Sequence, residues 1–102
     1  MSYQEESAKF AVYWDKMYPF MGLCEEAGEL LGVINKRRRK GEIHPIYNRC
    51  PVLMDELGDV MWMVAACCRE LNVSMEEVME MNLKKLEARA GEGELDRTPK
   101  DK

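Results

Sequence analysis

Two stretches of the chain repeat one twelve-residue pattern, and this repeat constrains the fold more than any other feature. Residues 23–34, LCEEAGELLGVI, align without gaps on residues 53–64, LMDELGDVMWMV. Each stretch combines a leading leucine, acidic residues, one matched glycine and apolar residues spaced three and four apart, which is the spacing of one helix face. We therefore predict two helices with the same arrangement of core and surface positions.

A first helix is predicted before the repeat. Ser2 and Glu5 have the spacing of a capping box, which indicates a helix N-terminus. An apolar stripe follows and ends near Pro19; it consists of Phe10, Tyr13, Trp14 and Met17. The second helix is expected to run from about Met21 into the basic stretch 36–40, with Gly41 where a C-terminal cap favours glycine.

The third helix follows a loop over residues 42–50. Pro51 suits a first helical position, and the periodic pattern continues to about Leu71. Asn72 and Val73 form the predicted turn. Ser74 and Glu77 are a second capping-box candidate and open a fourth helix, whose pattern includes Val78, Met81, Asn82, Lys85, Leu86 and Arg89.

The length of 102 residues allows one domain, expected over residues 1–90 and all-α. Residues 91–102, GEGELDRTPKDK, form a polar tail that we expect to be disordered. The net charge of −4 argues against nucleic acid or anionic membrane as partners. Four cysteines without a CxxC pair indicate neither zinc nor a disulfide framework, and the N-terminal segment has no signal-peptide pattern, so we expect a cytoplasmic protein.

A helical wheel places the acids of the repeat around the edge of its apolar face. The core positions are Leu23, Ala27, Leu30, Leu31 and Ile34, matched by Leu53, Leu57, Val60, Met61 and Val64. Glu26 and Glu56 lie on the shoulder of this face, and Glu29 and Asp59 lie one step further round. Glu25 and Asp55 lie furthest toward solvent. If the two helices pack antiparallel, the inner four carboxylates form one cluster.

Such a cluster predicts a metal site, because crowded carboxylates cannot all stay ionised without a cation. Oxygen ligands favour Mg²⁺ or Mn²⁺, and the lack of a Glu-x-x-His pair argues against a di-iron bundle. The alternative is that these acids are only the solvated flanks of amphipathic helices. That explanation suits one ExxE pair better than two matched pairs.

The motifs resemble those of the MazG-like nucleoside triphosphate pyrophosphohydrolases over roughly residues 20–90. The resemblance rests on Gly22-Leu23-x-Glu25-Glu26-x-Gly28-Glu29, on Glu56-Leu57-Gly58-Asp59-Val60 and on Asn82-x-x-Lys85-Leu86-x-x-Arg89. It implies an all-α four-helix bundle completed by oligomerisation as a homodimer or homotetramer. It also implies Mg²⁺-dependent hydrolysis of nucleoside triphosphates to the monophosphate and pyrophosphate, in nucleotide-pool housekeeping.

The resemblance assigns roles to named residues. Glu26, Glu29, Glu56 and Asp59 are the expected metal ligands. Glu25 is a candidate for orienting or deprotonating the attacking water, with Glu26 beside it, although it is alternatively an exposed helix residue. Asn82, Lys85 and Arg89 share one helix face and are candidate triphosphate contacts, with a solvated face as the alternative.

Three features leave alternatives open. The basic stretch 36–40 either binds phosphate or complements the helix dipole. Aromatic residues near the repeat either stack on a base or belong to the core; they are Trp14, Tyr18, Phe20 and Tyr47. The family's tyrosine-proline-aspartate-glycine run is replaced here by residues 90–93, AGEG. A non-catalytic, metal-stabilised interaction or regulatory module is the rival to an enzyme.

Overall fold

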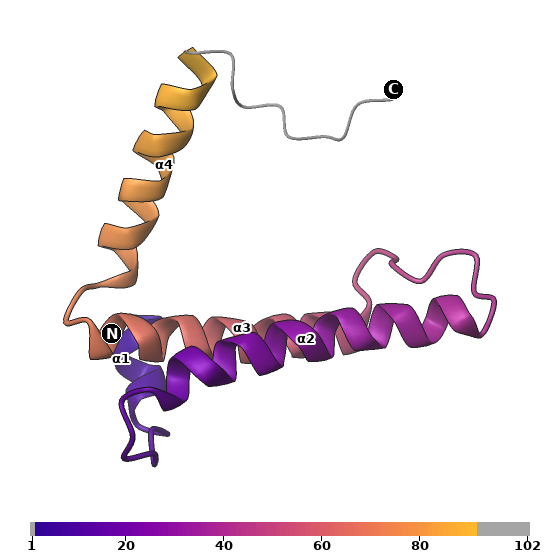
Figure 1. Ribbon diagram of the computed structural model, residues 1–102, viewed down its shortest axis with the longest axis horizontal. Helices are drawn as coiled ribbons and strands as arrows, with labels where there is room; N and C mark the ends of the chain where they lie inside the picture. The colour runs from indigo at the N-terminus through magenta and orange to yellow at the C-terminus, as the bar shows by residue number, and fades with distance from the viewer. Residues whose placement is uncertain (1, 92–102) are drawn as a thin grey trace.

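The computed structural model describes residues 2–91, which form four helices joined by loops (Figure 1). Helix α1 spans Tyr3–Ala8, α2 spans Tyr18–Arg39, α3 spans Pro51–Glu70 and α4 spans Met75–Gly91. This part of the chain contains no strand, which confirms the predicted all-α class. None of its helices is both long and apolar enough to cross a membrane.

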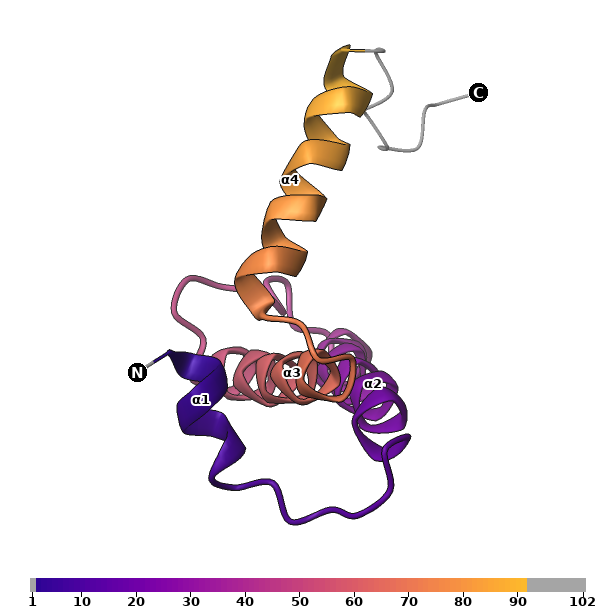
Figure 2. The same cartoon turned by 90° about the vertical axis from the view of Figure 1, so that its left-hand side faces the viewer.

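Helices α2 and α3 lie side by side and run antiparallel, as predicted (Figures 1 and 2). Helix α1 packs on α3, and α4 leaves the end of α3 and stands away from the pair. The Cα radius of gyration is 16.9 Å, whereas a compact domain of about 100 residues has one of ~13 Å. The four helices of one chain therefore do not close into a bundle, and closure by oligomerisation stays a prediction.

Local capping bonds form where the sequence predicts them. Ser2 Oγ accepts a hydrogen bond from the Glu5 amide at 3.2 Å, and the Glu5 carboxylate accepts one from the Ser2 amide at 3.1 Å, so the capping box is complete. Ser74 Oγ accepts one from the Glu77 amide at 3.1 Å at the start of α4. Gly41 follows α2 with φ +80°, the left-handed conformation that favours glycine after a helix.

The predicted first helix is wrong beyond Ala8. Lys9 ends α1, and residues 11–15 have no regular secondary structure, so Phe10, Trp14 and Met17 do not form a helical stripe. Aromatic and β-branched residues are weak helix formers, and tertiary bonds hold this segment instead. The Tyr13 hydroxyl donates to Glu70 Oε2 at 2.7 Å, and its ring stacks on Tyr18.

Helix α2 begins three residues before the predicted start at Met21. Pro19 occupies the first turn, where a missing amide hydrogen costs nothing because no helical carbonyl precedes it. The helix therefore includes Pro19 instead of following it. The predicted extent of α3, the loop over residues 42–50 and the turn at Asn72 all agree with the structure within a residue or two.

The buried core is smaller than the helical wheel predicts. It is concentrated in the C-terminal half of α3, and its apolar members are Cys50, Leu53, Met63, Ala65, Ala66, Cys67 and Cys68. The prediction of a core position is wrong within one chain for Ala27, Leu31, Leu57 and Met61, which are exposed. The physical reason is that α4 does not cover this face.

The side chain of Gln4 connects α1 to the turn before α4. Its amide nitrogen donates to the Val73 carbonyl at 3.0 Å, and its amide oxygen accepts from the Met75 backbone at 2.8 Å. The turn itself contains Asn72 at φ +58°, a conformation that asparagine tolerates better than most residues. These bonds determine the direction in which α4 leaves the helix pair.

Gly41→Ala should destabilise the protein by about 1 kcal/mol, because alanine at positive φ meets its own backbone. Denaturant unfolding followed by circular dichroism measures the loss. Gly91→Ala is the matched control, since Gly91 is helical and a Cβ there meets nothing within 4 Å. Equal stability of the two variants would contradict the conformation assigned to Gly41.

Candidate metal centre

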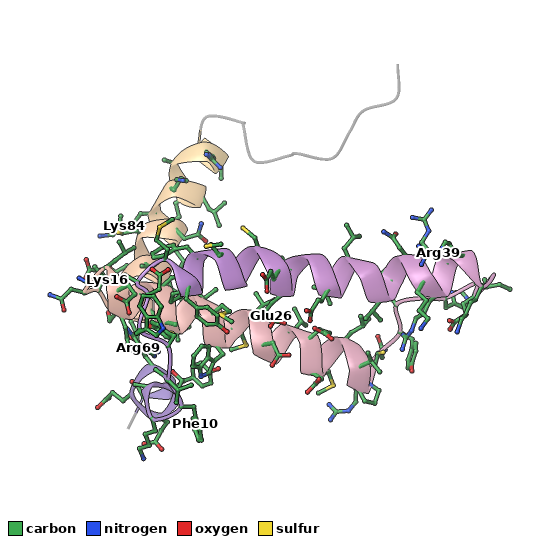
Figure 3. All side chains as sticks on the ribbon, turned by 60° about the horizontal axis from the view of Figure 1, so that its bottom comes forward. Phe10, Lys16, Glu26, Arg39, Arg69 and Lys84 are labelled. Atoms are coloured by element: carbon green, nitrogen blue, oxygen red, sulfur yellow. The ribbon has the colours of Figure 1, made fainter. Side chains whose placement is uncertain are left out.

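Three carboxylates meet between α2 and α3. Glu26 and Glu29 lie one turn apart on α2, and Glu56 approaches from α3, so that one oxygen of each lies within 4.8 Å of the others. Figure 3 shows Glu26 between the two helices. The antiparallel pairing thus brings together Glu26 and Glu56, which occupy matched positions of the repeat and lie 30 residues apart in the sequence.

Two of these carboxylates are partly withdrawn from solvent. Glu26 and Glu56 are half-buried, and one oxygen of each, Oε2, is buried without a hydrogen-bond partner among the described residues. A buried carboxylate oxygen with no donor is costly. The two oxygens therefore fit the positions of metal ligands, for which a cation replaces the missing donors.

The pKa values of both half-buried acids are raised. Burial is the main cause for Glu26, followed by the charges of Glu29 and Asp59. Burial also raises the pKa of Glu56, again followed by the charges of Glu29 and Asp59, with a smaller effect of Asp55. A divalent cation would remove this penalty by balancing the charges.

The remaining acids of the repeat lie around this group. Asp59 is exposed and does not belong to the group of three, although its charge acts on Glu26 and Glu56. Glu25 and Asp55 are exposed, as the helical wheel predicts. Three of the four predicted ligands thus converge, and the fourth lies near enough to affect their titration.

The donor set fits a hard divalent ion. All ligand atoms at the group are carboxylate oxygens, and Mg²⁺ and Mn²⁺ prefer such ligands, whereas zinc and copper favour nitrogen and sulfur. The four cysteines are free and lie outside the group. Glu26, Glu29 and Glu56, with Asp59 beside them, are the residues that would hold the ion.

The predicted triphosphate contacts lie on another part of the molecule. Asn82 and Lys85 are exposed and Arg89 is half-buried on α4. Because α4 stands away from α2 and α3, one chain does not bring these side chains to the carboxylates (Figures 1 and 2).

The basic stretch at the end of α2 includes one residue with a structural role. Arg37 Nη1 donates to the Pro45 carbonyl at 3.0 Å and to Cys50 Sγ at 3.1 Å. Its guanidinium also lies 5.5 Å from the centre of the Tyr47 ring. Arg37 and Tyr47 therefore hold the loop that joins the two acidic helices, a role that their spacing in the sequence did not reveal.

Comparisons with known proteins identify the family of the chain. Residues 20–92 match the model of the MazG nucleotide pyrophosphohydrolase domain. Gene 37 protein of Mycobacterium phage L5 is 42% identical over 77 residues, which cover 74% of this chain and 67% of that protein. No solved structure matches the chain significantly.

The all-helical fold and the family model together identify the class as a nucleotide pyrophosphohydrolase domain. This chain belongs to the MazG family, because the family model spans more than half of it, from the start of α2 past the end of α4. The resemblance predicted from the acidic motifs is thereby confirmed.

Glu26→Gln should stabilise the metal-free protein at neutral pH, because it removes one charge from a crowded, half-buried group. The pKa of Glu26 is raised in the folded state above its ordinary 4.5, so the folded state binds the proton more tightly than the unfolded state does. Wild-type stability should therefore rise as the pH falls through the raised pKa toward 4.5. The variant should lose part of this pH dependence.

Denaturant unfolding in EDTA at several pH values measures both effects. Glu25→Gln is the control, since it removes one negative charge from the same helix at an exposed position outside the group. An unchanged pH dependence in Glu26→Gln would contradict the crowding of these carboxylates.

Proposed function

We propose that this protein hydrolyses ribo- or deoxyribonucleoside triphosphates to the nucleoside monophosphate and pyrophosphate, with Mg²⁺ as its cofactor and Mn²⁺ as a substitute. The supporting observation is the convergence of Glu26, Glu29 and Glu56, two of them with a buried oxygen that has no donor among the described residues. The family supports cleavage of a nucleotide pyrophosphate bond. The proposed role is nucleotide-pool housekeeping in the cytoplasm, where four free thiols are stable.

In this proposal Glu26, Glu29, Glu56 and Asp59 hold the metal. A divalent ion held there would neutralise phosphate charge and lower the pKa of the attacking water. Glu25 adjoins the group from an exposed position on α2, where its carboxylate accepts the proton of the attacking water. The water oxygen bonds to the α-phosphorus as the bond to the bridging oxygen breaks, and pyrophosphate departs.

Asn82, Lys85 and Arg89 are proposed to bind the triphosphate from α4 of a second copy. Lysine and arginine are the side chains that balance phosphate charge. Because α4 does not reach the carboxylates of its own chain, a complete site needs another chain. The protein is accordingly proposed to be a homodimer or a homotetramer built from two dimers.

Exposed apolar surface supports this assembly. Leu31 on α2 is 57% exposed and Leu57 on α3 is 49% exposed, although the repeat places both on an apolar face. Gly28 and Gly58 occupy matched positions in the repeat, and a Cβ at either would meet nothing within 4 Å of its own chain. Glycine inside a helix costs about 1 kcal/mol against alanine, which close packing of a partner helix would explain.

The rival function is a non-catalytic, metal-stabilised module for interaction or regulation. Such a module would keep the carboxylates and bind metal, so metal binding does not distinguish the two functions. Hydrolysis products do, because only the enzyme forms a monophosphate.

A panel of ribo- and deoxyribonucleoside triphosphates with Mg²⁺ should yield monophosphate and pyrophosphate, resolved by ion-exchange chromatography. Diphosphate with free phosphate would place cleavage at the γ-phosphate instead. No turnover of any triphosphate by a protein that binds Mg²⁺ would favour the non-catalytic module.

Amide substitutions at the acids should fall into three groups. Glu26→Gln, Glu29→Gln, Glu56→Gln and Asp59→Asn should each abolish most activity and reduce the rise in melting temperature that Mg²⁺ causes, because each removes a ligand. Glu25→Gln should lower kcat while keeping that rise. Asp55→Asn should remain active. An inactive Asp55→Asn together with an active Glu56→Gln would contradict the assignment of Glu56 to the inner side of α3 and of Asp55 to its outer side.

Mixed oligomers should test whether the site is shared between chains. Glu56→Gln and Lys85→Ala should each be nearly inactive alone. After joint unfolding and refolding in equal amounts, random pairing makes half of the dimers mixed, and one of the two sites in each mixed dimer contains only wild-type residues. Activity should return to about one quarter of the wild-type value.

The matched control pairs two variants of the carboxylate group, Glu56→Gln with Glu26→Gln, which place a defect in every site and should give no recovery. Light scattering should show a mass of at least twice 11.9 kDa. A monomeric mass, or no recovery in the first mixture, would contradict the shared site.

A further inference from the structure

A cavity of about 460 Å³ lies at the start of α2, and its lining includes Glu25, the residue before the first carboxylate of the group. It lies between the non-helical segment 12–15 and the first two turns of α2, and Trp14, Tyr18, Met21 and Glu25 contribute to its lining. Its volume falls within the roughly 300–1,000 Å³ that small-molecule sites occupy. The chain leaves α1 after Ala8 and loops round to the start of α2 (Figure 2). Residues 12–15 of this loop form one side of the cavity.

The cavity and the proposed metal ligands follow one another along the same helix. Gly22 and Glu25 line the cavity, and Glu26 and Glu29 begin the carboxylate group. Gly22 and Glu26 are four residues apart, which corresponds to about 6 Å along the helix axis. A nucleotide with its phosphates at the carboxylates therefore has this cavity within reach of its base.

One wall of the cavity is the aromatic pair Tyr13 and Tyr18, and contacts outside the cavity fix the position of Tyr13. The rings of Tyr13 and Tyr18 stack with centroids 5.3 Å apart and an angle of 27° between their planes. Tyr13 is held by its 2.7 Å hydrogen bond to Glu70 and by a T-shaped contact with Trp62, whose ring centroid is 6.4 Å away. A wall that is fixed before binding lowers the entropy cost of stacking a planar ligand.

Trp14 lines the same cavity with 93% of its surface exposed. Its ring contributes little to the folded core, and tryptophan is an effective surface for base stacking. Val12, also 93% exposed, lies beside it at the cavity. Apolar surface of this kind next to a cavity is typical of a ligand site.

The charged groups that line the cavity are both carboxylates, Asp15 and Glu25. Asp15 Oδ1 accepts a hydrogen bond from the Met17 amide at 2.9 Å, which orients the carboxylate. A carboxylate accepts hydrogen bonds and repels carbonyl oxygens. Cytosine, adenine and guanine have an exocyclic amino donor, whereas thymine presents a carbonyl where cytosine has its amino group.

We propose that this cavity receives the nucleobase of the triphosphate, which stacks against Tyr18 and Trp14, and that Asp15 favours bases with an exocyclic amino group. The inference rests on the proposed function, because the base reaches this cavity only if the phosphates of the nucleotide lie at the carboxylates. Trp14 and Asp15 are thus specificity residues, and neither takes part in the bond cleavage.

Kinetics of Trp14→Ala test the stacking. The variant should raise KM for CTP roughly ten-fold, the size of effect expected for one base–aromatic stack, and leave kcat nearly unchanged. Inhibition by inorganic tripolyphosphate, which has no base, should keep its wild-type inhibition constant. Phe10→Ala is the matched control, because Phe10 is an exposed aromatic residue of the same segment and does not line this cavity.

Asp15→Asn tests the base preference. Asparagine retains an oxygen that accepts the hydrogen bond from the Met17 amide. Its side-chain NH₂ group can also donate a hydrogen bond to a carbonyl oxygen of the base. The ratio of kcat/KM for CTP to that for UTP should exceed one in the wild type and fall toward one in this variant. A ratio unchanged by Asp15→Asn would overturn the assigned preference.

Fluorescence provides a reading that does not depend on hydrolysis. CMP should quench the tryptophan emission of the wild type, and UMP should do so only at higher concentration. Trp14→Phe should lose the quenching, since Trp62 donates its indole hydrogen to the Ser7 carbonyl and does not line this cavity.

The two proposals fail in different ways. Triphosphate hydrolysis with Trp14→Ala kinetics equal to those of Phe10→Ala would overturn the base site and leave the enzymatic function intact. Quenching by CMP in a protein that cleaves no triphosphate would support the base site and contradict the proposed reaction.

Discussion

Mutual repulsion among the carboxylates between α2 and α3 is the constraint on which the site depends. Packing the two helices places Glu26 and Glu56 together, half-buried and next to Glu29. The apolar contacts that hold the pair must offset this repulsion when no cation is present. Burial disfavours the charged form of Glu26 and Glu56 and so raises both pKa values. A bound cation would be favourable because it would balance these buried charges. The same packing thus costs stability and brings together the carboxylates that would hold a cation.

The buried apolar core, which stabilises the fold against this repulsion, lies to one side of the carboxylates. Buried residues gather in the C-terminal half of α3, where α1 and the start of α2 cover them. At the other end of the helix pair, Arg37 holds the connecting loop through Pro45 and Cys50. The carboxylates lie between these two anchored ends, so their positions are determined without direct contact with most of the core.

Much apolar surface of a single chain stays exposed, and this links assembly to stability. A partner that covers Leu31 and Leu57 would add burial worth ~25 cal/mol for each Å² of apolar surface. In such a case the folded state and the oligomer stabilise each other by mass action. Helix α4 likewise buries none of its own residues within one chain, and the apolar surface of a helix needs a neighbour to pack against.

Local physics made much of this protein predictable from its sequence. The Ser2–Glu5 capping box, the positive φ of Gly41 and the bounds of α3 follow from hydrogen bonds and sterics within a few residues. The repeat also placed Glu26, Glu29 and Glu56 on facing helix edges, because helical periodicity determines which side chains share a face. Only the tertiary structure decided that residues 9–17 leave the helix, since the bond from Tyr13 to Glu70 joins residues 57 positions apart. It also decided that Leu57 stays exposed and that α4 stands apart, because those outcomes depend on which surfaces meet, and no local pattern contains that information.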